Sequence, residues 1–385
     1  MTTVSQAVAF LDYFSGLEDP RQSGKVLYPL DEVMLLVLCG ELAGADGFAD
    51  IELWGETHLD FLRRFLPFAH GIPCHDVLND VFNALDHEAF RDGFIVWAES
   101  LRTVVPDLAG PEVIAIDGKT SRRSGDKAKG RAALHLVSAW ASAQRLVLGQ
   151  EAIDDKENEI VAIPRLLEML ELTGALVTID AMGCQKAIAS TIHAKKADYL
   201  LPVKDNQPSL RQDIELFFNE QRACGFADAK TFFHQTVEKD HGRIETRRHW
   251  STSDIDWLNK LHDWTALTSI GFIEREVESG GKVQLSRHFY ISSLPADAVL
   301  LARAARSHWG IESRLHWVLD VVFHDDLCRL RTDNGPQNFA IVRHIALNLL
   351  KKAKGKISLR ATRKKAGWST DFLEAVIKGG GDPVP

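Results

Sequence analysis

The chain has 385 residues, of which 45% are hydrophobic and 25% are charged. This length is enough for one large domain with an insertion or for two or three domains, each with a sizeable apolar core. The formal net charge is −8 and the pI is about 6.0. The overall charge therefore argues against a uniformly basic nucleic-acid-binding protein, and any contact with phosphates must come from local basic segments.

Membrane and disulfide-rich classes are also excluded by the sequence. It contains no run of 18 apolar residues, and its start, MTTVSQAVAFLDYFSG, lacks the basic residues and cleavage site of a signal peptide. We therefore expect a soluble, cytoplasmic protein. The five cysteines form no CxxC pair, which argues against a disulfide framework or a zinc ribbon. They are Cys39, Cys74, Cys184, Cys224 and Cys328.

The first part of the chain, residues 1–108, is predicted to be an all-helical N-terminal domain. Apolar residues recur at helical spacing in LDEVMLLVLCGELAG, ADIELWGETHLDFLRRFL and EAFRDGFIVWAESL. Prolines at positions 67, 73 and 106 interrupt these segments.

Residues 109–227 have the pattern of an α/β core. EVIAID, ALHLVSAWAS and RLVLGQEAI are apolar, β-branched runs separated by short turns, as in a meander of three strands. A helix over NEIVAIPRLLEMLEL then leads to a strand ending in LVTID, a second helix and the strand ADYLLPV. This order predicts a mixed sheet in which the fourth strand lies parallel to the first.

The remaining chain divides into a β-rich insertion and a second helical part. Residues 228–295 alternate like antiparallel strands, and residues 296–385 return to helical periodicity. Three tryptophans lie in or beside the insertion, at positions 250, 257 and 264, and we expect at least two of them in its core. Within the last part, RSHWGIESRLHWVLD (306–320) reads as one helix. The predicted fold class is thus α/β, a mixed-sheet core interrupted by a β-rich insertion.

Three acidic residues are candidates for a metal site. Asp117 and Asp180 end the first and fourth strands, and ligands of open α/β sheets bind at the carboxyl ends of strands. Two adjacent carboxylates repel each other, and a hard cation such as Mg²⁺ or Mn²⁺ relieves this repulsion. Glu312 shares a helical face with histidines and large apolar side chains, so we expect it in low-dielectric surroundings that demand a partner. A third acid from this helix would complete a site for two metal ions.

Each of these residues also has a purely structural interpretation. An aspartate after a strand is often an N-cap or turn residue, and Glu312 alone is compatible with a surface acid paired with Arg314. The joint pattern is more specific, because the acids close the first and fourth strands and a glutamate follows the β insertion.

Two basic segments stand out in this acidic chain. One is KTSRRSGDKAKGR, from Lys119 to Arg131, and the other, from Arg343 to Trp368, contains no Asp or Glu. Either segment is compatible with a solvated surface or with contact to phosphates. For Lys119 we favour the phosphate contact, because it follows Asp117 by two residues.

Long motifs along most of the chain resemble the transposases of bacterial insertion sequences that carry a DDE triad, in the family related to the H-repeat-associated proteins. The motifs are LEDPR, YPLDEVMLLVLCGELAGADGFADIELWG, IAIDGKTSRRS, VTIDAMGCQ, VKDNQPSL, HGRIETR and HWGIESRLHWVLDVVFHDD. They contain all three candidate acids.

The resemblance implies an RNase H-like core in which Asp117, Asp180 and Glu312 are catalytic and bind Mg²⁺ or Mn²⁺, in two ions. It implies cleavage at the ends of a mobile element, strand transfer into target DNA, a homodimer that pairs two ends, and an N-terminal domain that binds DNA ends. The DNA-binding candidates are Lys119, Arg122, Arg123, Arg243, Arg247, Arg306, Arg314 and His316.

The sequence departs from the wider group of transposases with a β insertion at three positions. That group carries Tyr and Arg before the glutamate and Lys after it, where this chain has Ala305, His308 and Leu319. Two alternatives stay open. One is an inactive relic that at most binds DNA, and the other is a nuclease of the same fold that cuts DNA without joining it.

Overall fold

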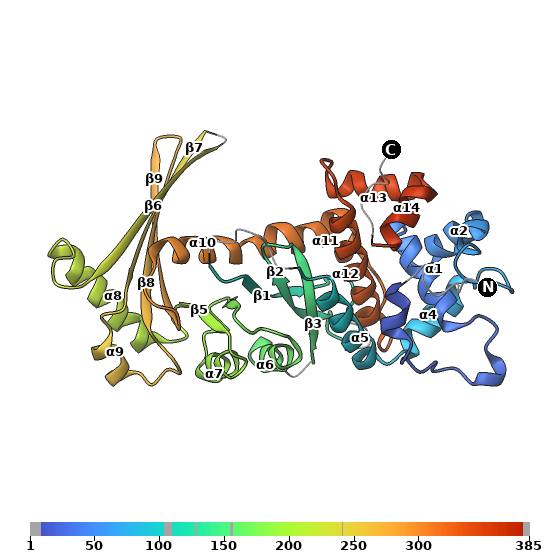
Figure 1. Cartoon of the computed structure of the whole chain (residues 1–385), viewed down its shortest axis with the longest axis horizontal. Helices are drawn as coiled ribbons and strands as arrows, with labels where there is room; N and C mark the ends of the chain where they lie inside the picture. The colour runs from blue at the N-terminus through green and yellow to red at the C-terminus, as the bar shows by residue number, and fades with distance from the viewer. Residues whose placement is uncertain are drawn as a thin grey trace.

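The computed structural model describes residues 9–103, 110–126, 128, 130–154, 157–240 and 242–379. The molecule is elongated, with a β-rich end, a central α/β part and a helical end that holds both chain termini (Figure 1). No helix in the described ranges combines the length and apolar character needed to cross a membrane.

One nine-stranded sheet runs through the β-rich end and the centre, in the order β3-β2-β1-β4-β5-β9-β8-β7-β6. Strand β1 pairs in parallel with β4, and β4 pairs in parallel with β5, which confirms the predicted parallel pairing of the first and fourth strands. The other pairs are antiparallel. The strands are β1 (Val113–Thr120), β2 (His135–Ala141), β3 (Leu146–Ile153), β4 (Leu176–Ile179), β5 (Asp198–Val203), β6 (Thr231–Asp240), β7 (Arg243–Thr252), β8 (Ser269–Ser279) and β9 (Lys282–Ser292).

The predicted β insertion supplies the strands β6 to β9, and these strands extend the core sheet through the pairing of β9 with β5. Their outer ends project past the helix that crosses the sheet (Figure 1), and we call this projection the β arm, residues 234–249 and 273–288. Trp250 and Trp264 are buried, which confirms the expectation that at least two of the three tryptophans belong to the core.

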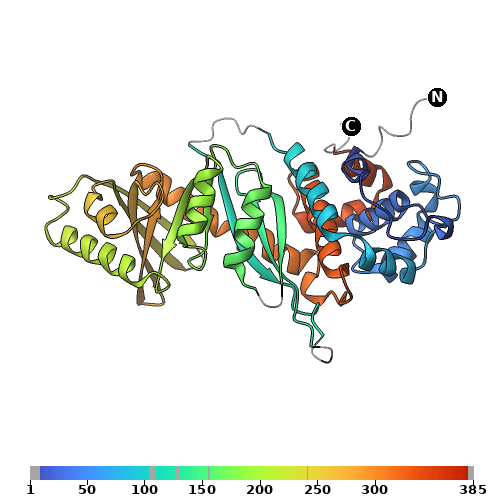
Figure 2. The ribbon, with the colours of Figure 1, turned by 90° about the horizontal axis from the view of Figure 1, so that it is seen from below.

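Helices cover both faces of the sheet. Helices α6 (Glu159–Met169) and α7 (Lys186–Ala194) pack side by side on one face (Figure 2), and α8 (Pro208–Ala223) and α9 (Asp256–Leu261) lie by the insertion strands. Helix α10 (Ala298–His308) crosses the opposite face and contacts β1, β4, β5 and β7. The sheet is therefore buried on both sides at its centre, as its almost uninterrupted apolar strands require.

The segment expected to form one helix over residues 306–320 is instead interrupted. Helix α10 ends at His308, a π-helical turn spans Glu312–His316, and α11 (Trp317–Val322) follows. Within the π turn the Trp317 amide donates to the carbonyl of Glu312, five residues back. Such a turn inserts one residue into the helical repeat and occurs frequently at functional sites.

At the helical end, N-terminal and C-terminal helices share one apolar core. Helix α1 packs against α2, α12 and α13, and α5 packs against both α12 and β3. The predicted boundary at residue 108 lies outside the described residues, and the described helices before and after the sheet pack together. The helices are α1 (Leu30–Ala43), α2 (Phe48–Thr57), α3 (Leu59–Leu62), α4 (His75–Ala84), α5 (His87–Ser100), α12 (Gly335–Ala353), α13 (Leu359–Trp368) and α14 (Thr370–Ile377), with short 3-10 turns η2 (Ala9–Phe14), η3 (Ser23–Lys25) and η6 (Asp325–Leu327).

A chain of buried charges crosses this core. Glu41 of α1 is fully buried and accepts a hydrogen bond from Arg363 (3.1 Å), while Arg343 of α12 donates to Asp325 (2.7 Å). Burial by itself raises the pKa of Asp325, but Arg343 and Lys119 outweigh it and hold this pKa below its usual range. A buried carboxylate of this kind is stable only while its partners remain in place.

Replacing Asp325 by alanine should therefore destabilise the fold by roughly 3–5 kcal/mol, because Arg343 and Lys119 would be left without their shared partner. Thermal and urea unfolding would measure the loss. Asp326→Ala is the matched control, since Asp326 is more exposed, and its effect should be about 1 kcal/mol or less. Equal effects of the two substitutions would contradict the assigned role of Asp325.

Candidate active site

Of the three predicted acids, Asp117 lies within β1 and Asp180 directly follows the adjacent parallel strand β4. Ile116 of β1 is paired with Ile179 of β4, so the next residues, Asp117 and Asp180, are neighbours. One oxygen of each carboxylate is held by a backbone amide: Gly118 donates to Asp117 (2.9 Å) and Gly183 donates to Asp180 (3.1 Å). These bonds orient the two side chains.

The pKa values of both aspartates are raised by burial and, to a smaller extent, by neighbouring negative charges. Burial, together with the nearby charges of Glu159, Asp180 and Glu312, raises the pKa of Asp117 to about 7, although the Gly118 amide opposes the shift. The pKa of Asp180 is also raised, first by burial and then by Glu159. A set of converging carboxylate oxygens is the donor set that hard divalent cations prefer, so these residues fit Mg²⁺ or Mn²⁺.

The third acid, Glu312, occupies a different environment from the one expected. It begins the π turn and is exposed, and within the described ranges it has no hydrogen-bond or ion-pair partner. The expectation of low-dielectric surroundings was wrong, because Trp309 and Trp317 beside it are themselves more than half exposed. Glu312 nevertheless lies close enough to Asp117 to contribute to the raised pKa of that carboxyl.

A fourth carboxylate, that of Glu159, was missed by the sequence reasoning. Glu159 is the first residue of α6, and its Oε1 lies 2.8 Å from Nε2 of His135. It faces both aspartates, since its charge raises both of their pKa values. The sequence signal was only that of a helix start, with Asn158 as the capping residue.

Gly118 provides the space that this carboxylate occupies. A Cβ atom at position 118 would lie 2.2 Å from Oε1 of Glu159 and 2.6 Å from Nε2 of His135. A side chain at position 118 is therefore incompatible with the observed arrangement beside Asp117.

His316, one of the predicted DNA contacts, lies beside Asp117 instead of at the surface. Its Nδ1 is 3.6 Å from Oδ2 of Asp117, and its Nε2 is buried without a hydrogen-bond partner among the described residues. Burial, assisted by the positive charge of Lys119, lowers the pKa of His316 to about 4. The imidazole is therefore neutral at pH 7.

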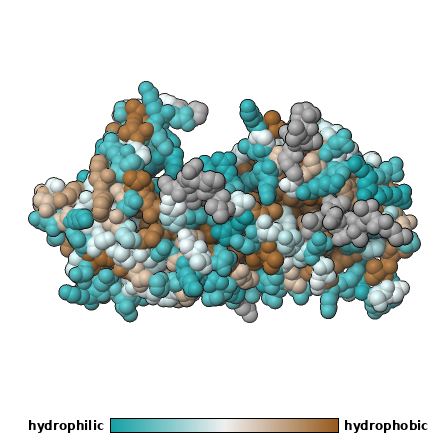
Figure 3. All heavy atoms as spheres, viewed as in Figure 1, coloured by the Kyte–Doolittle hydropathy of each residue, from teal (hydrophilic) through white to brown (hydrophobic). Residues whose placement is uncertain are grey.

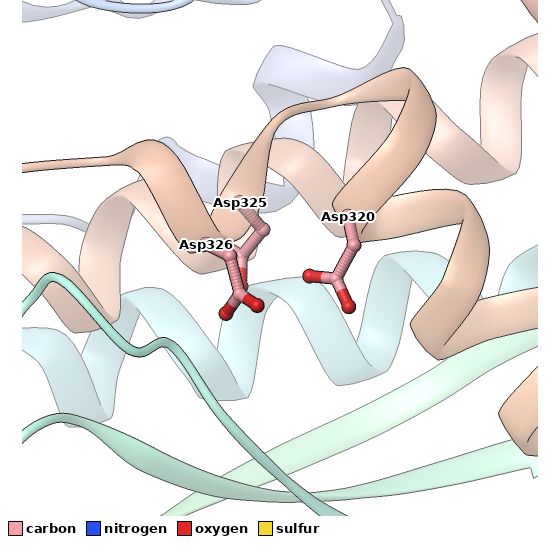
Figure 4. Close-up of side chains that lie close together, drawn as sticks. All are labelled: Asp320, Asp325 and Asp326. Atoms are coloured by element: carbon pink, nitrogen blue, oxygen red, sulfur yellow. The ribbon is translucent and has the colours of Figure 1, made fainter.

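Lys119 is held by acidic residues and does not present its ammonium group to solvent. Its Nζ lies 2.7 Å from Asp320, 3.1 Å from Asp325 and 3.6 Å from Asp326, and the side chain is only 11% exposed. These aspartates converge from the end of α11 and from η6 (Figure 4), with oxygen atoms within 4.8 Å of one another. The phosphate contact expected for Lys119 is replaced here by an internal counter-charge for the three carboxylates.

The other predicted DNA-binding residues lie in different parts of the structure. Arg122 and Arg123 are exposed beyond β1, where Arg122 also pairs with Asp326 (3.3 Å). Lys127 and Lys129 of the same basic segment lie outside the described residues, as does His241 of the HGRIETR motif. Arg314 is exposed two residues after Glu312 and has no acidic partner within the described part of the chain.

The predicted Arg243 and Arg247 of the β arm come together with the predicted Arg306 of α10 around two glutamates. Glu238 accepts from Arg306 (2.8 Å) and Arg247 (3.1 Å), while the buried Glu245 pairs with Arg243, Arg247 and Arg275. Arg275 was not predicted. Four arginines against two glutamates leave a net charge of +2. Because the glutamates hold the guanidinium groups in place, this arginine cluster (Arg243, Arg247, Arg275 and Arg306) is preorganised for an anion.

A broad hollow separates the β arm from the helical end on the face shown in Figure 3. Helix α10 and the segment leading into α11 run along its floor (Figure 1). Apolar side chains are also exposed on the arm, among them Val237, Val283 and Leu285. The hollow thus lies between the arginine-bearing arm and the helices that follow Glu312.

Comparison with known protein families shows which family the chain belongs to. Residues 108–349 match the model described as the transposase DDE domain, and residues 11–98 match the model described as DDE_Tnp_1-associated. The chain therefore belongs to the family of transposases with this DDE domain. The resemblance inferred from the sequence motifs is confirmed.

Individual relatives are similar over almost their whole length. The H repeat-associated putative transposase YhhI of Escherichia coli (strain K12) is 38% identical over 96% of this chain and 98% of its own. The putative transposase YncI of Escherichia coli O157:H7 is 40% identical over 96% of this chain and 94% of its own. A solved piggyBac transposase synaptic complex with hairpin DNA covers 96% of this chain and 78% of its own, at 11% identity and a TM-score of 0.41, which is too low to support any argument.

Placing alanine at position 118 tests the arrangement of Glu159 and His135. Gly118→Ala should destabilise the protein by about 1–3 kcal/mol, because the new methyl group overlaps both side chains. Thermal unfolding is the measurement. Gly24→Ala is the control, since a Cβ there meets nothing within 4 Å. An effect no larger than that of the control would show that Glu159 does not lie against Gly118.

The raised pKa of Asp117 predicts a pH dependence of stability in metal-free protein. Between pH 4 and pH 7 the folded protein holds a proton at Asp117 that the unfolded chain has lost, so Asp117 makes stability fall as the pH rises. Asp117→Asn removes this effect. In EDTA, its Tm should exceed that of the wild type by roughly 2–5 °C at pH 8, with the difference vanishing towards pH 4.

The control for this measurement is Asp228→Asn, because Asp228 is exposed and has no hydrogen-bond or ion-pair partner within the described residues. Its unfolding curve should follow that of the wild type at every pH. A Tm of Asp117→Asn that stays equal to the wild-type value at pH 8 would contradict the proximity of the carboxylates.

Proposed function

We propose that this transposase cleaves the ends of an insertion sequence and transfers the freed strand into target DNA, using Asp117, Asp180 and Glu312 to bind two Mg²⁺ or Mn²⁺ ions. The observation that carries the proposal is the placement of Asp117 within β1 and of Asp180 directly after the adjacent parallel strand β4, with Glu312 near enough to raise the pKa of Asp117. When bound, the ions supply stabilisation of the charge that develops in phosphoryl transfer.

The core around these acids is proposed to be RNase H-like. Three antiparallel strands are followed by a helix, a parallel strand, a second helix and a further parallel strand. The amides of Gly118 and Gly183 hold the two aspartates in one orientation, and the exposed Glu312 is accessible from solvent. DNA that approaches the hollow therefore meets the third acid directly.

The arginine cluster of the β arm is the proposed contact for the DNA backbone. Guanidinium groups bind phosphates with two parallel hydrogen bonds, and their binding to Glu238 and Glu245 lowers the cost of holding them in place. Arg122, Arg123 and Arg314 are proposed to extend this contact on the other side of the acids. The helices of residues 1–108 are proposed to bind the element's ends, and two copies of the chain to pair them.

A nicking assay on duplex DNA that carries the sequences flanking the gene tests the proposal. In Mg²⁺, the wild type should cut one strand at the element end, and Glu312→Gln should cut at least about 100-fold more slowly, because it removes a metal ligand. Chelation by EDTA should abolish the cleavage. Glu220→Gln, which changes an exposed acid on α8, should cut like the wild type.

The same assay separates the two alternatives. Binding of the DNA without cleavage in Mg²⁺ or Mn²⁺ would identify a relic that only binds DNA, and cleavage without any joined product would identify a nuclease. Equal cleavage by the wild type and Glu312→Gln would contradict the proposal that Glu312 is a metal ligand.

A further inference from the structure

From a cavity on the α10 side of the sheet we infer a second anion site, which holds a phosphate of the DNA strand several nucleotides from the point of cleavage. The cavity measures about 340 Å³. One wall comes from the end of β2 and the turn after it, and the other from the helical segment; the lining residues are Trp140, Ser142, Arg306, Ser307, Trp309, Gly310, Ser313 and Arg314. This inference rests on the proposed action on DNA, and the cavity adjoins the arginine cluster of the β arm through Arg306, which belongs to both.

The charged side chains in the cavity wall are those of Arg306, which pairs with Glu238 (2.8 Å), and Arg314. The fields of Arg145 and Arg306 act on Arg314. Lys351 of α12 lies close enough to Arg145 and Arg314 for their positive charges to act on it. Across the described residues, no carboxylate pairs with Arg145, Arg314 or Lys351. This absence contrasts with the β arm, where each arginine has a glutamate partner.

Lys351 is held beside the two arginines by two contacts. Its Nζ lies 3.7 Å from the centre of the Trp140 ring and donates to the carbonyl of Arg314 (3.0 Å), so the ammonium group is fixed between the sheet and the π turn. Burial, followed by the repulsion of Arg145 and Arg314, lowers the pKa of Lys351. The bond to the carbonyl gives Lys351 a structural role. The guanidinium groups of Arg145 and Arg314 have no acidic partner among the described residues.

Like charges gathered without an acid are stabilised by a bound anion. The hydroxyl groups of Ser307 and Ser313 in the wall are suited to hydrogen bonds with phosphate oxygens, whereas the Ser142 hydroxyl donates to the carbonyl of Ser307 (3.3 Å). The exposed ring of Trp309 adds a flat apolar surface beside them. A phosphodiester with an adjacent base matches this combination of cations, hydroxyls and an aromatic ring.

The position of the cavity relative to the acids identifies the DNA strand as the source of the phosphate. Ser142 is hydrogen-bonded to Val113, at the start of β1 and four residues before Asp117. Four residues of extended strand span about 13 Å, which corresponds to about four nucleotides along one strand of duplex DNA. Glu312 and Arg314 lie two residues apart in the same π turn, so one strand can contact both.

The salt dependence of DNA binding tests this site. Binding of a fluorescein-labelled duplex of about 30 base pairs from the gene's flank would be followed by anisotropy over a range of KCl concentrations. Arg145→Ala/Arg314→Ala should lower the affinity by about tenfold or more and reduce the slope of log K against log salt by about 1. The control, Lys25→Ala/Lys260→Ala, removes the same charge from exposed and unpaired lysines and should leave both values unchanged.

Replacing single phosphates of the DNA by an uncharged linkage shows which phosphate the cavity contacts. Methylphosphonate placed at single positions near the cleavage point should weaken binding to the wild type at one position about four nucleotides away. The double arginine variant should show no loss at that position, since it no longer makes the contact. Its Tm should equal or exceed that of the wild type, because the substitution relieves repulsion on Lys351, so a folding defect would not explain the weaker binding.

An unchanged salt slope in the double variant would overturn the inference. A second result would also overturn it: the wild type binds millimolar inorganic phosphate and the double variant does not, yet both bind DNA equally well. Failure of the proposed function is distinguishable from these results, because it appears as a wild type that does not cleave DNA. Anisotropy reports the cavity's contact whether or not cleavage occurs.

Discussion

The arrangement of the acids depends on the burial of one carboxylate, that of Asp325. One of its oxygens accepts from Arg343 in the helical end, and the other accepts from Lys119 and Ser121 beside β1. Asp325 thus joins the helices that follow Glu312 to the strand that carries Asp117. This bond and the packing of α10 against β1 and β4 together fix the distance between the two halves of the candidate site, which come from segments about 200 residues apart.

At the centre of the site, three carboxylates lie close together. Asp117, Asp180 and Glu159 converge from β1, from the turn after β4 and from the start of α6, and the absence of a side chain at Gly118 lets them do so. Converging carboxylate oxygens of this kind are the donor set that hard divalent cations prefer.

Much of this arrangement was predictable from local sequence. The apolar runs ending in Asp117 and Asp180, with two helices between strands, determined which strands would be parallel, and the structure has that pairing. Glu159 was not predictable, because its approach to the aspartates follows from the order β3-β2-β1-β4 and not from any nearby residue. The exposure of Glu312 was missed for a different reason: a regular helical period places it against its neighbours, whereas the π turn changes that period. The partners of Lys119 are distant in sequence, so its charge suggested a phosphate contact instead.

The pairing of β9 with β5 has a mechanical consequence. Since the β arm and the catalytic strands belong to one hydrogen-bonded sheet, no flexible linker separates them along this path. The direction of the arm is set by the twist that accumulates from strand to strand, about 20–25° at each step. The sheet therefore holds the β arm at a fixed angle to the strands β1 and β4.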